Sequence, residues 1–263
     1  MTTVQAARGP ETPIMAIAGA SVSFGAARVL DGIDLELRRG EFVCVVGPSG
    51  SGKTTLLRLL SGLQPATTGT VFHQGTVQNG PARGVAIVFQ DYAHALLPWR
   101  TAAGNVSLAL EAAGLPRAQR ADRIAALLAT VGLAAHADHF PAQMSGGMQQ
   151  RLQIARCLAQ DPDVLLMDEP FGALDAMTRQ KLQDEILRIV AASGVTAFFV
   201  THDLEEAIYL GDRVVALEPN PGRVGAIFDV PLPRPRTQLS TREHPEFLRL
   251  RRDLFDFIQQ FEP

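Results

Sequence analysis

The spacing of apolar side chains predicts the order of strands and helices along the chain. Residues 14–46 alternate apolar and polar positions in short runs separated by glycines, which predicts antiparallel strands. A helical pattern follows over 53–61, and short strands are predicted at 69–72 and 85–89. Residues 101–140 are rich in alanine and leucine at helical spacing, so they predict a helical block between two regions of mixed strand and helix.

The second half of the chain alternates helices with short strands. Helices are predicted around 146–159, around 177–191 and from Leu204 onward, and fully apolar strands at 164–167 and 196–200. Strands this short and this continuously apolar, alternating with helices, are typical of a parallel sheet that is covered on both faces. The fold class predicted from the pattern is therefore α/β.

Prolines interrupt the chain before a last amphipathic helix at 244–261. The predicted apolar stripe of this helix consists of Phe247, Leu250, Leu254, Phe257 or Ile258, and Phe261. Its polar face mixes arginines with aspartates, which favours packing on its own domain over the alternative, binding at a membrane surface.

Composition indicates an ordinary globular protein. Of the 263 residues, 46% are apolar and 19% are charged, which excludes collagen-like, coiled-coil and disordered chains. The formal net charge of −3 argues against binding nucleic acid by bulk electrostatics. Cys44 and Cys157 both lie in apolar patterns, so they are predicted to be buried thiols without a disulfide.

No apolar run approaches the eighteen or so residues that a membrane-spanning helix needs. The first residues also lack a basic segment followed by a sustained apolar one, which a secretory signal would have. The sequence therefore predicts a chain that does not cross the bilayer and that lies in the cytosol.

The strongest chemical signal is a glycine-rich segment where a predicted strand gives way to a helix. It fits the phosphate-loop pattern G-x-x-x-x-G-K-[ST] with Gly47, Pro48, Ser49, Gly50, Ser51, Gly52, Lys53 and Thr54. Such a loop turns backbone N–H groups toward phosphate oxygens, while Lys53 would neutralise the β and γ phosphates and the Thr54 hydroxyl can bind Mg²⁺. A flexible Gly/Ser turn is the alternative, which the strand-to-helix context disfavours.

Two adjacent carboxylates, Asp168 and Glu169, follow the apolar strand 164–167. Ligands of open α/β sheets bind at the carboxyl ends of the strands, so this pair is predicted to lie where a ligand binds. Asp168 is expected to join the Mg²⁺ shell and Glu169 to orient and deprotonate an attacking water. Taken alone, an exposed acidic turn would explain this pair equally well.

A second anion-binding arrangement opens the helix at 146–159. Ser145, Gly146 and Gly147 stand at its start, where N–H groups and the helix dipole favour negative charge. This turn and the phosphate loop could touch one triphosphate within a single chain, or they could meet across a two-fold interface. The residues alone do not decide between the two arrangements.

Together these motifs resemble the ATP-binding cassette (ABC) ATPase subunits of transporters. The resemblance rests on GPSGSGKTT, the Gln90 that follows Val88-Phe89, MSGGMQQR, VLLMDEP, GALD and the His202 that follows Val200-Thr201, in this order and spacing. It implies a P-loop NTPase (RecA-like) core with a parallel sheet, an N-terminal antiparallel β subdomain and an inserted helical subdomain.

The resemblance also implies a division of the chain. Residues 1–13 would be a flexible N-terminus, and 14–230 the ABC ATPase domain with its helical subdomain at about 92–160. Residues 231–263 would form a C-terminal proline-rich segment and amphipathic helix.

By the same resemblance, ATP and Mg²⁺ are the cofactors of a head-to-tail homodimer. Phe24 would stack on adenine where tyrosine is more usual, and residues 47–54 with Thr55 would bind the phosphates. Ser145, Gly146 and Gly147 would close over the ATP held by the other subunit, although Met148 stands where glutamine is most common in the family. Asp175 would communicate across the dimer.

The family pattern implies three catalytic residues and three metal ligands. The catalytic residues would be Glu169, His202 and Gln90, with His202 holding the γ-phosphate and Glu169 in place. The metal ligands would be Thr54, Gln90 and Asp168.

The segment 89–100 contains the only tryptophan, and aromatic and leucine side chains in a loop suggest a partner surface. By resemblance it receives a helix of a membrane permease, while a hydrophobic cluster within the domain is the alternative. Leu97-Pro98-Trp99-Arg100, GALDAMTR and Pro221-Gly222-Arg223-Val224 look like the importer subfamily for nitrate, sulfonate, taurine and related anions. The implied protein is peripheral on the cytoplasmic face of the cell membrane.

The implied partners are two permease subunits and, indirectly, a substrate-binding protein, with no nucleic acid. Two other functions stay open at this point. One is a soluble ABC ATPase that acts on nucleic acid or ribosomes, and the other is a non-catalytic module that uses nucleotide for assembly.

Overall fold

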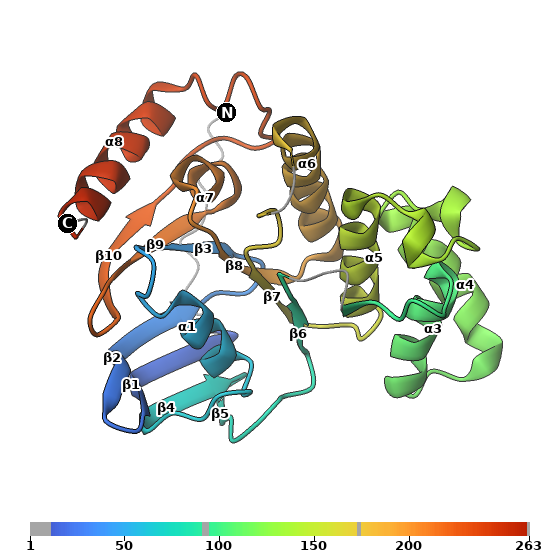
Figure 1. Ribbon diagram of the computed structural model, residues 1–263, viewed down its shortest axis with the longest axis horizontal. Helices are drawn as coiled ribbons and strands as arrows, with labels where there is room; N and C mark the ends of the chain where they lie inside the picture. The colour runs from blue at the N-terminus through green and yellow to red at the C-terminus, as the bar shows by residue number, and fades with distance from the viewer. Residues whose placement is uncertain (1–11, 91–94, 173–174, 262–263) are drawn as a thin grey trace, which may run out of the picture.

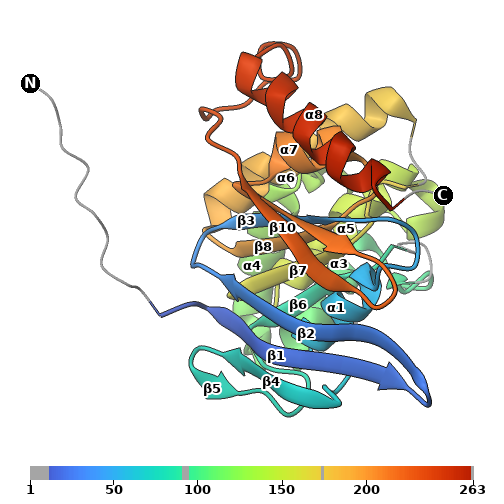
Figure 2. The same cartoon turned by 90° about the vertical axis from the view of Figure 1, so that its left-hand side faces the viewer.

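The computed structural model describes residues 12–90, 95–172 and 175–261 (Figure 1). Two sheets lie one above the other, and a group of helices stands to one side of them (Figures 1 and 2). The predicted N-terminal tail up to residue 11, Asp91 and Tyr92 of the segment 89–100, and Ala173 and Leu174 of the GALD motif lie outside the described residues.

The smaller sheet is antiparallel throughout. Its strand order is β2-β1-β4-β5, with the bounds β1 Met15–Phe24, β2 Ala27–Leu37, β4 Thr68–His73 and β5 Thr76–Val77. Along β2, Ile33, Leu35 and Leu37 are buried while Asp34 and Glu36 are exposed. This alternation confirms the antiparallel prediction for residues 15–37, because only one face of the sheet meets the core.

The larger sheet has the strand order β10-β9-β3-β8-β7-β6. The bounds are β3 Phe42–Val46, β6 Val85–Val88, β7 Val164–Asp168, β8 Thr196–Val200, β9 Arg213–Glu218 and β10 Arg223–Asp229. The pairs from β9 to β6 are parallel, and β10 is antiparallel to β9. The α/β class predicted from the sequence is confirmed by this mostly parallel sheet.

One strand was assigned wrongly from the sequence. The prediction placed residues 42–46 with the antiparallel strands of 14–46, but β3 lies between β9 and β8 and is parallel to both. All five residues of β3 are buried, so its pattern is the continuous apolar run of a doubly covered strand, and the alternation ends at Leu37. The patterns also did not predict β9 and β10.

Helices cover both faces of the parallel sheet. Their bounds are α1 Lys53–Leu60, α3 Ala102–Ala112, α4 Arg117–Thr130, α5 Gly146–Leu158, α6 Ala176–Ser193, α7 Leu204–Leu210 and α8 Pro245–Gln259, with short 3₁₀ helices at Ala134–His136 and Pro141–Gln143. The predicted helical block is present as α3 and α4, which pack on each other and on α5. Among the described residues, none of these helices is long and apolar enough to cross a membrane.

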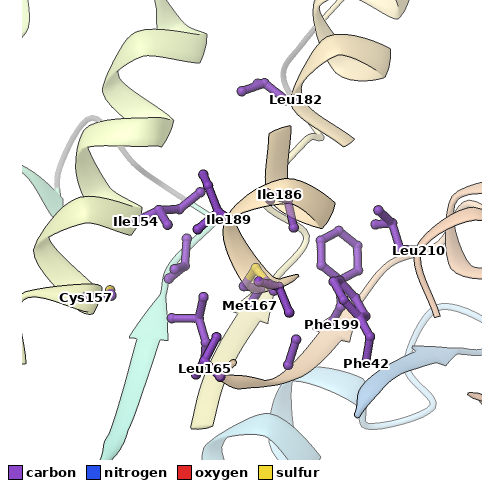
Figure 3. Close-up of a cluster of buried hydrophobic side chains, with 14 of the residues drawn as sticks. Phe42, Ile154, Cys157, Leu165, Met167, Leu182, Ile186, Ile189, Phe199 and Leu210 are labelled. Carbon is purple, nitrogen blue, oxygen red and sulfur yellow. The ribbon is translucent and has the colours of Figure 1, made fainter. Parts of the chain in front are cut away.

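Alternate residues of the central strands enter two separate cores. Leu165 and Phe199 (Figure 3) face the core that α5, α6 and α7 cover, as does Cys44. Their neighbours Val45 and Leu166 face α1 and the antiparallel sheet. The helices α1 and α5 therefore cover opposite faces of the parallel sheet. The thiols of Cys44 and Cys157 are buried and free, as predicted.

The predicted apolar stripe of the last helix is confirmed on α8. Phe247, Leu250 and Leu254 are buried, and the ring of Phe257 meets that of Phe228 on β10 edge-on at 6.4 Å between centroids. Figure 2 shows α8 lying beside α7, on which it packs.

Phe199 offers a test of the core. Its ring is fully buried between Phe42 and Phe171, with centroid separations of 6.0 and 5.4 Å. We expect Phe199→Ala to lower the free energy of unfolding by about 3–5 kcal/mol, because it removes apolar burial and leaves a cavity. Urea denaturation measures the loss. The control Phe255→Ala alters a ring that is 50% exposed, and equal midpoint shifts for both variants would contradict this assignment of the core.

Candidate nucleotide-binding site

The glycine-rich loop 47–54 joins β3 to α1 at the carboxyl edge of the parallel sheet. A Cβ atom at Gly47 would lie 2.7 Å from Ser51 Oγ and 2.9 Å from Leu217 O, and one at Gly52 would lie 2.6 Å from Leu30 Cδ2. Gly52 also has φ +87°, a left-handed conformation that favours glycine. Sterics therefore require glycine at the first and last glycines of the motif.

The start of α1 offers backbone donors to an anion. Lys53, Thr54 and Thr55 occupy the first turn, whose N–H groups have no partner within a helix. No acidic residue lies in this turn and no side chain caps it, so an anion would complete these bonds.

The Lys53 side chain folds back over the loop. Its Nζ donates to the carbonyl oxygens of Gly47 at 2.8 Å and Pro48 at 3.1 Å. Burial lowers the pKa of Lys53, and the nearby carboxylates of Glu169 and Asp168 act in the opposite direction. The ammonium is thus held at the centre of the loop, within the field of both acidic residues.

The two carboxylates at the end of β7 point to different partners. Thr54 Oγ1 donates to Asp168 Oδ1 at 3.3 Å, while Glu169 Oε2 lies 3.2 Å from His202 Nδ1. Burial raises the pKa of Asp168, and the Thr54 hydrogen bond lowers it. A hydroxyl and a carboxylate oxygen side by side suit Mg²⁺, which takes a few protein oxygens and fills its shell with phosphate and water.

Glu169 adopts φ +40°, a left-handed conformation that is unfavourable for a side chain other than glycine. Its N–H donates to the carbonyl of Val200 at 3.0 Å, and its own carbonyl accepts from Gly172 at 3.2 Å. These bonds hold the turn against the backbone preference, which is how strain persists at functional positions. They direct the Glu169 carboxylate toward His202, whose side chain is 65% exposed.

Gln90 follows β6, next to β7 in the sheet. Its amide nitrogen would lie 3.8 Å from a Cβ atom at Gly172, in the turn that begins with Glu169. The structure therefore brings Gln90 toward the same end of the sheet as Asp168, Glu169 and His202.

The Ser145 turn lies elsewhere in the chain. Ser145 is exposed and caps α5 by accepting from the Met148 N–H at 3.4 Å, and Gly147 is buried where α5 meets α6. The helix α5 that begins at this turn and the helix α1 that follows the phosphate loop cover opposite faces of the parallel sheet. Met148 packs its partly buried side chain against the larger core, which explains an apolar residue there.

Two further predicted residues lie at the ends of elements. Asp175 caps α6, its Oδ1 accepting from the Thr178 N–H at 3.0 Å, and hydrogen bonds from Thr178 lower its pKa. Phe24 ends β1 with 52% of its surface exposed, next to the strand whose Leu30 contacts the phosphate loop. A half-exposed ring of this kind is available for stacking.

Sequence reasoning did not find Thr201, Gln183 and Glu206, which form a buried polar cluster behind His202. Glu206 is only 3% exposed, and burial raises its pKa while hydrogen bonds from Thr201 and Gln183 lower it. The adjacent Glu205 is partly exposed, and the pattern Leu204-Glu205-Glu206 contains no signal for which carboxylate points inward.

Comparison with known proteins agrees with this geometry. Residues 30–172 match the family model described as ABC transporter. The chain is 47% identical over 232 residues to an uncharacterized ABC transporter ATP-binding protein of Methanocaldococcus jannaschii, covering 88% of this chain and 85% of that protein.

Two relatives carry more specific names. The aliphatic sulfonates import ATP-binding protein SsuB 2 of Burkholderia cenocepacia is 45% identical, covering 96% of this chain and 90% of that protein. The nitrate import ATP-binding protein NrtC of Synechococcus elongatus is also 45% identical and covers 88% of this chain, which spans only 35% of that relative's length.

A solved structure shares the fold. A dimeric ATP-binding cassette in a post-hydrolysis state, bound to ADP and Pi, superposes with a TM-score of 0.68 at 31% identity, covering 82% of this chain and 98% of the other. This likeness confirms the predicted P-loop NTPase fold, with its parallel core and antiparallel β subdomain. The family match and the relatives together establish that the chain belongs to the ABC transporter ATP-binding proteins.

Proposed function

We propose that this chain is the ATP-hydrolysing subunit of an ABC importer for a small anion, and that two copies bind ATP between them. The observation that carries the proposal is the pairing of Glu169 with His202 at 3.2 Å, beside a phosphate loop whose lysine lies in the field of Glu169. A module that only binds nucleotide for assembly would not need a carboxylate paired with a histidine at this place. The net charge of −3 likewise gives no support to a nucleic-acid ATPase.

Nucleotide binding would use residues 47–55 together with the ring of Phe24. The N–H groups of the loop and of α1 would bind phosphate oxygens, and the Lys53 ammonium would exchange its bonds to Gly47 and Pro48 for oxygens of the β and γ phosphates. Phe24 would stack on adenine through its exposed face.

The second half of the site would come from another copy. Ser145, Gly146 and Gly147 begin a helix on the opposite face of the sheet from α1. In the proposed head-to-tail dimer, a second chain would place them over the phosphates. The related cassette is described as dimeric and bound to ADP and Pi, which supports a dimer of this chain. Asp175, at the start of α6, would lie at the same interface.

Mg²⁺ would be held by Thr54 and Asp168, with Gln90 as the third candidate ligand. When bound, the ion neutralises charge on the phosphates. The catalytic work of the chain's own residues lies beside it: Glu169 accepts the proton of the attacking water, and His202 fixes that carboxylate through Nδ1 and leaves Nε2 for the γ-phosphate.

The permease would dock near Trp99, whose side chain is 71% exposed, and Phe89, which is 48% exposed. Buried Asn105 fixes this loop by accepting from the Leu97 N–H and donating to three backbone carbonyls between residues 97 and 101. Leu96 is buried in the core, so it belongs to a hydrophobic cluster within the domain. The exposed rings of Phe89 and Trp99 are the side chains left for a partner surface.

The names of the nitrate and sulfonate relatives support a small anion as the imported compound. We further propose that the protein is peripheral on the cytoplasmic face of the cell membrane and is served indirectly by a substrate-binding protein. Residues 14–230 would form the ATPase unit, with a helical subdomain at about 92–160, and 231–263 a C-terminal extension.

The general base is tested by Glu169→Gln. An amide keeps the shape of the carboxylate but accepts no proton, so we expect ATP turnover to fall by about 10²–10⁴-fold while ATP still binds and a dimer accumulates. Phosphate release and size-exclusion chromatography with ATP measure the two effects. The control Glu36→Gln alters an exposed carboxylate on β2. Normal turnover by Glu169→Gln would refute the role of this residue.

The head-to-tail dimer is tested by cross-linking. Ser49 and Ser145 are exposed, and the native thiols are buried, so the variant Ser49→Cys/Ser145→Cys has two accessible thiols. In a Glu169→Gln background we expect ATP and mild oxidant to produce a covalent dimer on non-reducing gels. Each single-cysteine variant is the control. A disulfide that forms within one chain, leaving a monomer, would show that the two motifs meet in cis.

A further inference from the structure

The chain that follows β10 holds both ends of α7, the helix that begins two residues after His202. At the far end, the buried Arg236 donates through Nη1 to the carbonyl oxygens of Ile208, Tyr209 and Gly211 at 3.2, 2.8 and 2.8 Å. Burial lowers the pKa of Arg236 to about 10. The C-terminal segment is therefore built into the ATPase core.

The first turn of α7 is held by two arginines of the same segment. Glu205 accepts from Arg242 Nη1 at 2.6 Å and from Arg251 Nη1 at 3.0 Å. The Arg242 guanidinium also lies over the rings of Tyr209 and Phe247, at 5.3 and 5.9 Å from their centroids. A planar cation with this many partners has little freedom to move.

A second connection runs through buried groups to the strand end that carries His202. Arg242 Nη2 and Gln238 Nε2 both donate to Gln183 Oε1 at 3.3 Å. Gln183 Nε2 in turn donates to Glu206 Oε1 at 2.9 Å, and Thr201 Oγ1 donates to Glu206 Oε2 at 2.5 Å. Each buried partner therefore depends on the next for its hydrogen bond.

The backbone on either side of His202 is fixed by this cluster. Thr201 N donates to Val45 O at 3.1 Å, and Thr201 Oγ1 accepts from the Asp203 N–H at 3.1 Å. Asp203 Oδ1 accepts from the Glu206 N–H, which closes the turn. The His202 side chain is mostly exposed and meets Glu169, so the position of the imidazole follows the position of this turn.

We propose that Arg242 is a positioning residue for ATP hydrolysis: through Glu205 and Gln183 it fixes the first turn of α7 and thereby sets His202 against Glu169. The inference rests on the proposed function. Arg242 touches neither the phosphate loop nor Asp168, so its contribution falls on the rate of the chemical step and not on nucleotide affinity.

The test is Arg242→Gln in the full chain, assayed for ATP turnover and, separately, for ATP affinity and stoichiometry by equilibrium binding. We expect kcat per bound nucleotide to fall about tenfold, since small displacements of catalytic groups are costly, with KM and affinity within about twofold of wild type. The matched control is Arg249→Gln, because among the described residues Arg249 forms its ion pairs with Glu246 and Asp253, both on its own helix α8, and none with α7. Its kcat should equal that of the wild type.

A second variant guards against a folding defect in the first. Gln238→Leu removes the partner of Arg242 Nε and one of the donors to Gln183 while leaving Arg242 itself in place, and we expect it to lower kcat in the same direction. Wild-type kcat in both variants overturns the positioning role, as does a loss of affinity or stoichiometry that accounts for the lower turnover. A wild-type chain that binds ATP without hydrolysing it, alone or with its permease, would instead refute the proposed function.

Discussion

A strand that is buried on both faces can carry polar side chains only where it ends, and this constraint organises the whole molecule. Within β3 and β8 every residue is buried, and in β7 only the last, Asp168, is partly exposed. Each strand is followed at once by polar groups: the phosphate loop after β3, Asp168 and Glu169 at the end of β7, and Thr201 and His202 after β8. Since the strands are parallel, all these groups gather at one edge.

The same constraint explains which parts of the site were predictable. A Cβ atom at Gly47 or Gly52 would lie too close to neighbouring atoms. A sequence that forms this loop therefore has glycine at both positions. Asp168 and Glu169 were recognisable because an apolar run ends at them. The misplacement of β3 has the opposite cause: five apolar residues in a row are compatible with any buried strand, and only the pairing with β8 and β9 reveals that it is parallel.

The cluster behind the site could not be predicted because local pattern does not report burial at single positions. Glu205 and Glu206 are adjacent and chemically alike, yet one faces the arginines of the C-terminal segment and the other is buried against Gln183 and Thr201. Arg236 is a guanidinium with a fully buried side chain, against the general preference of arginine for the surface. Contacts between segments far apart in the chain determine both cases.

The charged groups at the carboxyl edge of the parallel sheet depend for their positions on the buried polar groups behind them. Lys53 faces two carboxylates, and an ammonium held between backbone carbonyls and acidic groups is ready to exchange those partners for phosphate oxygens without a large change in its surroundings. Glu169 is positioned by a strained turn on one side and by His202 on the other. In the described contacts, only the backbone of His202 and the carboxylate of Glu169 hold the His202 imidazole in place. The position of the Glu169 carboxylate therefore depends on how firmly α7 is held. A helix of seven residues has little stability of its own, so that order must come from the segment packed around it.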